Sequence, residues 1–206
     1  ALADPIIIGK DQAPINAHDY KVLEEVALNA QVPIEKFRHL KRSNHFIVGP
    51  EGFLYRDRKK NGLIDDKDSA EFISFTAPNS YITDDEGYLV AIKMKGTDFN
   101  NVTILNKFKK IVAIQLSDNN IENVNISNLP DLRFLKILER NNLRTLTKIK
   151  NVNNLSYFYV AGLNTPNFKK FTGVKGLRKI DISGMGIESF SGLENMPNLK
   201  EAEISS

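Results

Sequence analysis

The sequence has no cysteine among its 206 residues, and it has only three histidines. The absence of cysteine excludes disulfides, thiolate catalysis and cysteine-based zinc sites. No apolar run approaches the roughly 18 residues that a membrane-spanning helix needs. With 41% hydrophobic residues, the chain is long enough for a sizeable core, and its length is typical of one elongated body or two fused parts.

Motifs of catalysis are also missing. The histidines, His18, His39 and His45, are separated by 21 and 6 residues, which is not the spacing of a helical metal-binding pair. No Gly-rich phosphate loop and no G-x-S-x-G nucleophile motif occurs. We therefore predict a protein that is not an enzyme and has no cofactor. The alternative is an enzyme whose site, in residues 1–88, holds His39 or His45 beside a carboxylate.

One acidic cluster resembles a calcium loop in composition alone. It comprises Asp65, Asp66, Asp68 and Glu71. An EF-hand loop needs alternating oxygen ligands, a central glycine and a terminal glutamate at fixed spacing, and the cluster lacks them. We interpret the cluster as a solvated acidic turn and predict no metal site.

The strongest pattern is a repeat that fills residues 89–206. Its units start near residues 89, 111, 132, 155, 177 and 199, at intervals of 21 to 23 residues. Each unit has apolar residues at its first, fourth and sixth places, as in Ile111, Ile114 and Leu116. Units of this length cannot bury an apolar face alone, so they must stack as a solenoid whose core is built between neighbours.

This pattern resembles the leucine-rich repeat, in a short bacterial form similar to internalins. The unit nearest to the motif is Ile111–Ile121, with Asn119 at the ladder position. The resemblance implies an α/β fold: a leucine-rich repeat solenoid with a curved parallel sheet and an irregular convex side. The third unit has one extra residue, and Thr97, Leu163 and Met185 replace the ladder Asn in other units. We expect a looser stack there, because the Asn side chain satisfies backbone groups of the turn.

Residues 1–88 precede the array and are predicted to form an α+β cap or a small domain. A cap is physically required, because the first strand of a stack otherwise exposes an unpaired edge. Helical spacing, turn residues and short apolar runs define its parts. The expected elements are a helix from His18 capped by Asp19 and broken at residues 31–33, a second short helix over Ile34–Leu40, a hairpin over residues 46–55, and short strands over residues 71–76 and 80–83.

The third and fifth places of each unit define the surface of greatest interest. Side chains alternate across a strand, so these places face away from the core; we call this surface the concave face. In the middle units it carries Phe134, Tyr157 and Tyr159, which we expect to form a contiguous exposed patch. The charged residues expected around this patch are Lys93, Arg133, Lys136, Lys179, Asp181, Glu201 and Glu203.

We hypothesise that the patch binds a protein partner. Aromatic centres rimmed by charge are how protein interfaces concentrate affinity. The simpler interpretation is that aromatic pairs across the strands only stabilise the sheet, by roughly 0.2–1 kcal/mol per pair.

Charge distribution offers a second functional hypothesis. Residues 1–88 have 11 Lys+Arg and 15 Asp+Glu, whereas residues 89–206 have 17 and 10. Many of the basic residues fall late in their units: Lys107, Lys109, Lys110, Lys148, Lys150, Lys169, Lys170 and Lys175. A basic surface attracts polyanions, so the alternative function is binding of a polyanion or a cell-surface glycan. The simpler interpretation is a solubilising face.

Both ends of the sequence carry weaker signals. Ala1-Leu2-Ala3 followed by a polar residue has the form of a secretory cleavage site, so we expect a secreted or cell-surface protein, with a periplasmic location as a variant of this. At the other end, residues 201–206 read as a strand without a capping segment. An exposed final strand favours association. Self-association through this edge, protection by Glu201 and Glu203, and further residues after Ser206 are the alternatives.

Overall fold

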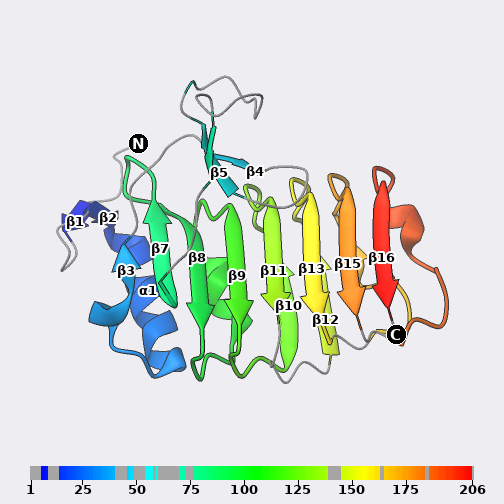
Figure 1. Ribbon diagram of the computed structural model, residues 1–206, viewed down its shortest axis with the longest axis horizontal. Coiled ribbons are helices and arrows are strands. Elements are labelled where there is room, and N and C mark those ends of the chain that lie inside the picture. The colour runs from blue at the N-terminus through cyan, green and yellow to red at the C-terminus, as the bar shows by residue number, and fades with distance from the viewer. Residues whose placement is uncertain are drawn as a thin grey trace.

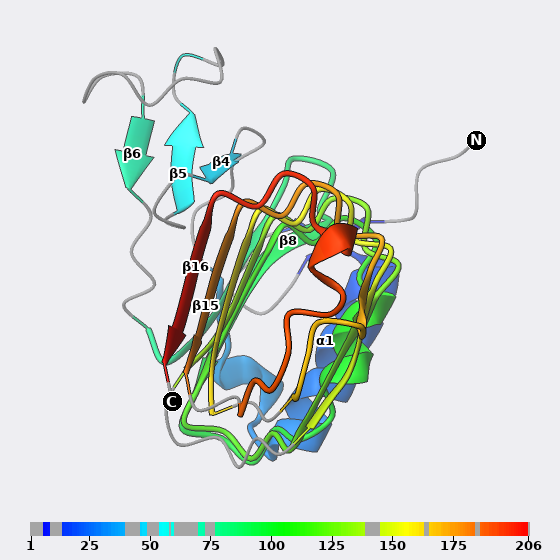
Figure 2. The ribbon, with the colours of Figure 1, turned by 90° about the vertical axis from the view of Figure 1, so that its right-hand side faces the viewer.

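The computed structural model describes residues 6–8, 14–39, 46–48, 54–57, 59, 70–72, 77–138, 145–162, 165–183 and 186–205. Its main sheet has eight strands in the order β16-β15-β13-β11-β9-β8-β7-β3 (Figure 1). A smaller three-stranded sheet, β10-β12-β14, lies behind it; we call it the return sheet. Helix α1 lies on this same side of the main sheet (Figure 2).

The strands of the main sheet are β3 (Arg38–His39), β7 (Asn79–Thr83), β8 (Leu89–Lys95), β9 (Ala113–Ser117), β11 (Phe134–Leu138), β13 (Tyr157–Ala161), β15 (Lys179–Ser183) and β16 (Glu201–Ser205). Those of the return sheet are β10 (Asn123–Ser127), β12 (Thr145–Lys150) and β14 (Phe171–Thr172). The 3-10 helices η2 (Val102–Lys107) and η3 (Leu193–Asn195) lie between strands of the array.

The six repeat strands β8, β9, β11, β13, β15 and β16 are all parallel to one another, which confirms the predicted solenoid. The fourth and sixth places of the units are turned into the core. Ile114, Leu135, Phe158 and Ile180 stand at the fourth place on successive strands, and all are fully buried. The apolar triplet therefore builds one continuous core along the stack, because each coil covers the coil before it.

The return sheet explains how units of unequal length share one stack. Strands β10 and β12 are parallel, and their register shifts after Val124. Val124 is the partner of Leu146, whereas Asn125 is the partner of Lys148. Thr147 is therefore the extra residue of a β-bulge, and it is exposed. The bulge absorbs a length difference and leaves the buried columns aligned.

Asn119 bridges two coils as the ladder motif implies. Its amide nitrogen donates to the Met94 carbonyl oxygen at 3.1 Å, and its amide oxygen accepts from the Thr97 backbone N–H at 3.2 Å. The Thr97 hydroxyl also donates to this oxygen at 2.6 Å and accepts from the Phe99 N–H at 3.1 Å. The expectation of a loose stack at Thr97 is therefore wrong, because a hydroxyl takes over the satisfaction of the turn. Leu163 and Met185 lie outside the described residues.

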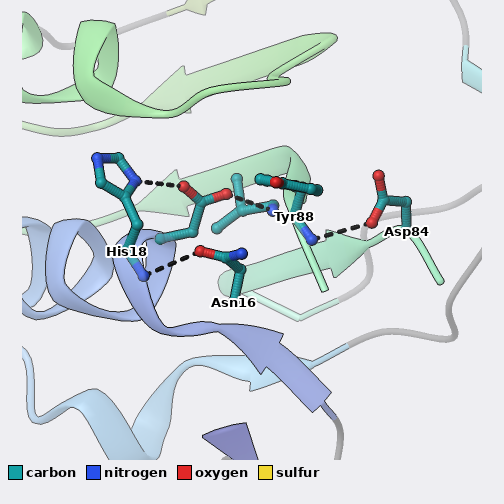
Figure 3. Close-up of polar contacts among 6 residues, drawn as sticks. Asn16, His18, Asp84 and Tyr88 are labelled. Atoms are coloured by element: carbon teal, nitrogen blue, oxygen red, sulfur yellow. Dashed lines mark hydrogen bonds and ion pairs between the residues drawn. The ribbon is translucent and has the colours of Figure 1, made fainter. Parts of the chain in front are cut away.

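Helix α1 (Ala17–Ala30) begins one residue earlier than the sequence pattern indicates. Its N-cap is Asn16, whose side-chain oxygen accepts from the His18 N–H at 2.9 Å, and not Asp19 (Figure 3). Asp19 is buried in the first turn instead. One of its carboxylate oxygens accepts from the Leu89 N–H at 2.8 Å, and the other lies 2.9 Å from Nδ1 of His18. This residue joins the helix to the first repeat strand.

The rest of the amino-terminal region extends and flanks the array. Strand β7 is antiparallel to β8, so the edge of the first repeat strand is paired, and β3 is added in parallel to β7. The expected hairpin is confirmed as β4 (Phe46–Val48) and β5 (Leu54–Asp57), to which β6 (Ala70–Phe72) is added. Strands β1 (Ile6–Ile8) and β2 (Pro14–Asn16) form a second hairpin.

The predicted second helix is wrong in extent. The 3-10 helix η1 (Ile34–Lys36) ends three residues after Pro33, and β3 follows at Arg38. Phe37, between these two elements, is buried. The backbone of Phe37 is extended, which is the geometry that leads into a strand and not into a further helical turn.

The last coil leaves part of the apolar column uncovered. Phe190 belongs to the same apolar column as Phe168, yet 63% of its surface is exposed, whereas Phe168 is buried. Ile204, in register with Ile182 on β15, is 40% exposed. Phe190 is exposed because no further coil among the described residues packs over the last one.

Candidate recognition surface

The concave face is the surface of the main sheet that carries the third and fifth places of each unit. Strand register places these residues in two rows. In the third-place row, Phe134 is next to Tyr157, and Tyr157 is next to Lys179. The fifth-place row runs Lys93, Gln115, Lys136, Tyr159, Asp181 and Glu203. The structure thus brings six of the predicted site residues together on the neighbouring strands β11, β13 and β15: Phe134, Lys136, Tyr157, Tyr159, Lys179 and Asp181.

Three aromatic rings form a stacked row in the middle of this face. The ring centroids of Phe134 and Tyr157 are 5.3 Å apart, and the ring planes differ by 7°. Those of Tyr157 and Tyr159 are 6.4 Å apart and differ by 15°. Aromatic pairs in such stacked arrangements contribute about 0.5–1.5 kcal/mol beyond the area they bury. The stacking of the three rings therefore adds to the stability of the sheet.

The expectation that all three aromatic residues are exposed is wrong for two of them. Phe134 is 6% exposed and Tyr157 is 7% exposed. Each ring lies face to face with the next, so little of either face meets water. Burial raises the pKa of the Tyr157 hydroxyl to about 12, and the negative charge of Asp181 adds to this shift. Only Tyr159 remains half-buried, and it is the aromatic residue available at the surface.

Two lysines lie over this aromatic row. The Lys136 ammonium is 5.4 Å from the Tyr159 ring centroid, and the Lys179 ammonium is 5.8 Å from that of Tyr157. Lys179 is also 3.4 Å from a carboxylate oxygen of Glu201 on β16. Cation–π contacts at partly exposed sites contribute about 0.5–1 kcal/mol. The lysines complete the cover over Tyr157 and border Tyr159.

Asp181 is the acidic neighbour of Tyr159 in the fifth-place row. Burial raises the pKa of its carboxyl group, and the neighbouring Glu203 charge and a hydrogen bond to Glu203 raise it further. Lys179 and Lys136 oppose this shift. The charge along the fifth-place row changes from positive at Lys136 to negative at Asp181, and the uncharged Tyr159 lies between them.

The two remaining predicted residues lie at the margins of the aromatic row. Lys93 is half-buried on β8, where burial lowers the pKa of its ammonium group and the nearby Lys95 adds to this. Arg133 is exposed and stands just before β11, with its N–H donating to the Val112 carbonyl oxygen at 2.8 Å. The Arg133 carbonyl oxygen also accepts from the Tyr157 N–H at 3.2 Å, so the backbone of Arg133 contacts the aromatic row while its side chain is exposed. Lys93 lies two strands away from Lys136 in the fifth-place row.

Comparison with known proteins agrees with this architecture. Residues 116–206 match the family described as the Endo-beta-N-acetylglucosaminidase EndoS LRR domain. The array is a leucine-rich repeat domain. The match begins in β9 and includes every later repeat strand, so it supports the fold and not an activity. No curated protein and no solved structure matches the chain.

The two histidines that the structure describes, His18 and His39, lie outside the concave face of the leucine-rich repeat domain. His18 contacts Asp19, as described above. Nε2 of His39 lies 2.8 Å from the Thr83 hydroxyl oxygen, and the His39 ring packs edge-on against Tyr81. His45 lies outside the described residues. Within the described part of the chain, no group of three acidic or histidine side chains is placed to hold a metal ion.

Helix α1 carries an apolar surface that the sequence pattern did not single out. Leu28 is 82% exposed and borders a shallow cavity of about 500 Å³, together with Val32 and Ile34. In the sequence, Leu28 is marked only by its helical position, which lies away from the face of α1 that contains the buried Leu23 and Val26. None of the helices in the described ranges is long and apolar enough to cross a membrane.

Proposed function

We propose that this chain is a non-catalytic recognition module that binds a protein partner through the concave face of its leucine-rich repeats. The observation that carries the proposal is the half-buried Tyr159 ring, held at the end of a stacked aromatic row and flanked by Lys136 and Asp181. A match to a leucine-rich repeat family supports an interaction role of this kind.

The buried aromatic residues give Tyr159 the properties of an interface anchor. Phe134 and Tyr157 pack against one another, and Tyr157 packs against Tyr159, so the exposed ring is already fixed before binding. Binding then orders few additional rotamers, and each rotamer left free to order would cost about 0.5–1.5 kcal/mol. A preorganised tyrosine beside charged groups is typical of the residues that dominate interface energies.

The charges on either side of Tyr159 favour one orientation of a partner. Lys136 is cationic and Asp181 is acidic, and Glu203 follows Asp181 in the same row. A partner with the opposite order of charges fits this row, whereas the reversed order places like charges together. Electrostatic complementarity of this kind mainly sets specificity and the rate of association.

The proposal is tested by comparing partner recovery between variants. Tyr159→Ala removes the ring, Tyr159→Phe retains it, and Tyr20→Ala removes a half-buried tyrosine from α1 as a matched control. We expect the wild-type chain, Tyr159→Phe and Tyr20→Ala to recover the same partner proteins. Tyr159→Ala is expected to lose them. Equal recovery of every bound protein by all four chains would refute the concave-face proposal.

A further inference from the structure

The return side of the solenoid carries two groups of lysines that differ in their surroundings. In the first unit, the Lys107 ammonium is 2.6 Å from a carboxylate oxygen of Glu25. Lys110 is 3.6 Å from a carboxylate oxygen of Glu86, and its ammonium lies 4.3 Å from the Tyr88 ring centroid. Acidic residues of the amino-terminal region thus neutralise the lysines of the first unit.

The lysines of the third and fourth units have no such partners. Among the described residues, no carboxylate forms an ion pair with Lys148, Lys150, Lys169 or Lys175, and all four side chains are exposed. Lys170 is exposed as well, and its ammonium donates to the Leu146 carbonyl oxygen at 2.9 Å. We call these five lysines the lysine face.

The return sheet explains why these lysines gather. Ile149 is buried, so alternation turns Lys148 and Lys150 outward on the same side of β12, about 7 Å apart along the strand. Lys150 is next to Thr172 of β14. The bond from Lys170 to Leu146 holds a third cation against the same strand. The bulge at Thr147 sets this register. Without the extra residue, each later side chain of β12 would move to the other face of the strand, and Lys148 would point toward the core.

The side chains between the lysines favour one class of polyanion. The outward positions of the return sheet that the structure describes next to these lysines are Asn125, Ser127 and Thr172. Ser127 and Thr172 offer hydroxyl groups, which hydrogen-bond to sugar hydroxyls and sulfate oxygens, whereas the amide oxygen of Asn125 is buried. None of them is aromatic, whereas single-stranded nucleic acids are bound through stacking of bases on aromatic rings.

We propose that the lysine face binds a linear sulfated polysaccharide. Lys148 and Lys150 of β12, together with Lys170 just before β14, contact the sulfate groups, and the neighbouring hydroxyl groups contact the sugar ring. This surface lies on the return sheet, behind the main sheet, so it is separate from the concave face (Figure 1). Binding of the polysaccharide is therefore compatible with occupation of the concave face by a protein.

The experiment measures binding of a size-fractionated heparin oligosaccharide to the full chain by isothermal titration calorimetry. The test variant is Lys148→Ser/Lys150→Ser. The control is Lys21→Ser/Lys36→Ser, which makes the same change in net charge at two exposed lysines of α1 and η1. A lysine near an anionic surface contributes about fivefold in affinity, so the test variant is expected to weaken binding about thirtyfold. The control is expected to bind as the wild type does.

Further comparisons separate this proposal from its alternatives. Desulfated oligosaccharide is expected not to bind, affinity is expected to fall steeply with salt, and Tyr159→Ala is expected to bind heparin normally. Equal weakening by the test and control variants, or absence of binding at low salt, would overturn the proposal. Tighter binding of duplex DNA than of heparin would overturn it as well, since the face would then serve a nucleic acid. Failure of the concave-face test leaves these results unaffected.

Discussion

Replacement of Asn119 by alanine tests the bridge between the first two coils. Asn119→Ala removes the hydrogen bond to the Met94 carbonyl oxygen and both bonds from Thr97. A buried group left without its partner costs about 1–3 kcal/mol. The Met94 carbonyl oxygen loses its only side-chain donor in this set. The N–H and hydroxyl of the half-buried Thr97 lose their acceptor, and water replaces part of that bonding. We therefore expect the free energy of unfolding to fall by about 2–4 kcal/mol.

Equilibrium unfolding in urea, followed by far-UV circular dichroism, measures this change. Asn123→Ala is the matched control, because Asn123 is exposed at the start of β10. Exposed substitutions of this kind stay within about 0.5 kcal/mol. If Asn119→Ala proves as stable as Asn123→Ala, the side chain does not bridge the coils, and the reasoning is wrong.

A double-mutant cycle with Thr97→Val isolates the part of this energy that belongs to the pair. Thr97 and Asn119 are in direct contact, so their effects are expected to be non-additive, with a coupling of about 0.5–3 kcal/mol. Simple additivity would mean that the threonine does not substitute for the missing ladder asparagine.

Three other predictions address the cap, the aromatic row and the last turn. Asp19→Ala leaves the Leu89 N–H without its acceptor, and we expect a loss of about 1–3 kcal/mol in urea unfolding; an unchanged midpoint would contradict the role of Asp19 as the link to the array. The raised pKa of Tyr157 means that the unfolded chain loses this proton first, so wild-type stability falls by up to about 2–3 kcal/mol between pH 10 and about 12. Tyr157→Phe should lack this component, and identical pH profiles for the two chains would show that the phenol is not buried. Gly192→Ala places a Cβ 2.3 Å from a backbone carbon at φ +98°, so it should destabilise the fold by at least about 2 kcal/mol more than Gly96→Ala, where φ is +71° and the space is open; equal losses would argue against this turn geometry.

Periodicity was sufficient to predict the array, because its signal is averaged over six units. The apolar triplets define both the strand positions and the face that each side chain takes, so the rows containing Tyr157 and Tyr159 were predictable from the sequence. The exposure of Phe190 was not predictable from the pattern. Its place in the repeat is that of a buried residue, but its burial depends on whether another coil covers it.

Exposure and pairing of the candidate site residues were beyond the sequence. The pattern places Phe134 and Tyr157 on the concave face, but only the three-dimensional structure shows that their rings stack and exclude water. The helix cap was misassigned for a related reason. Asp19 and Asn16 are both good capping residues, and the choice depends on the contact between Asp19 and Leu89, which are 70 residues apart.

The central claim is that every coil turns the same columns of side chains toward the concave face, in one parallel register. The chain has no cysteine, so disulfide formation between introduced cysteines tests this claim without interference. Gln115→Cys/Lys136→Cys places the thiols on paired residues of β9 and β11, about 4.8 Å apart at Cα, within disulfide range. Gln115→Cys/Tyr159→Cys spans two strand spacings, about 9.6 Å, which is too far. We predict rapid oxidation of the first pair and not of the second; oxidation of the second pair alone would contradict the register on which the account depends.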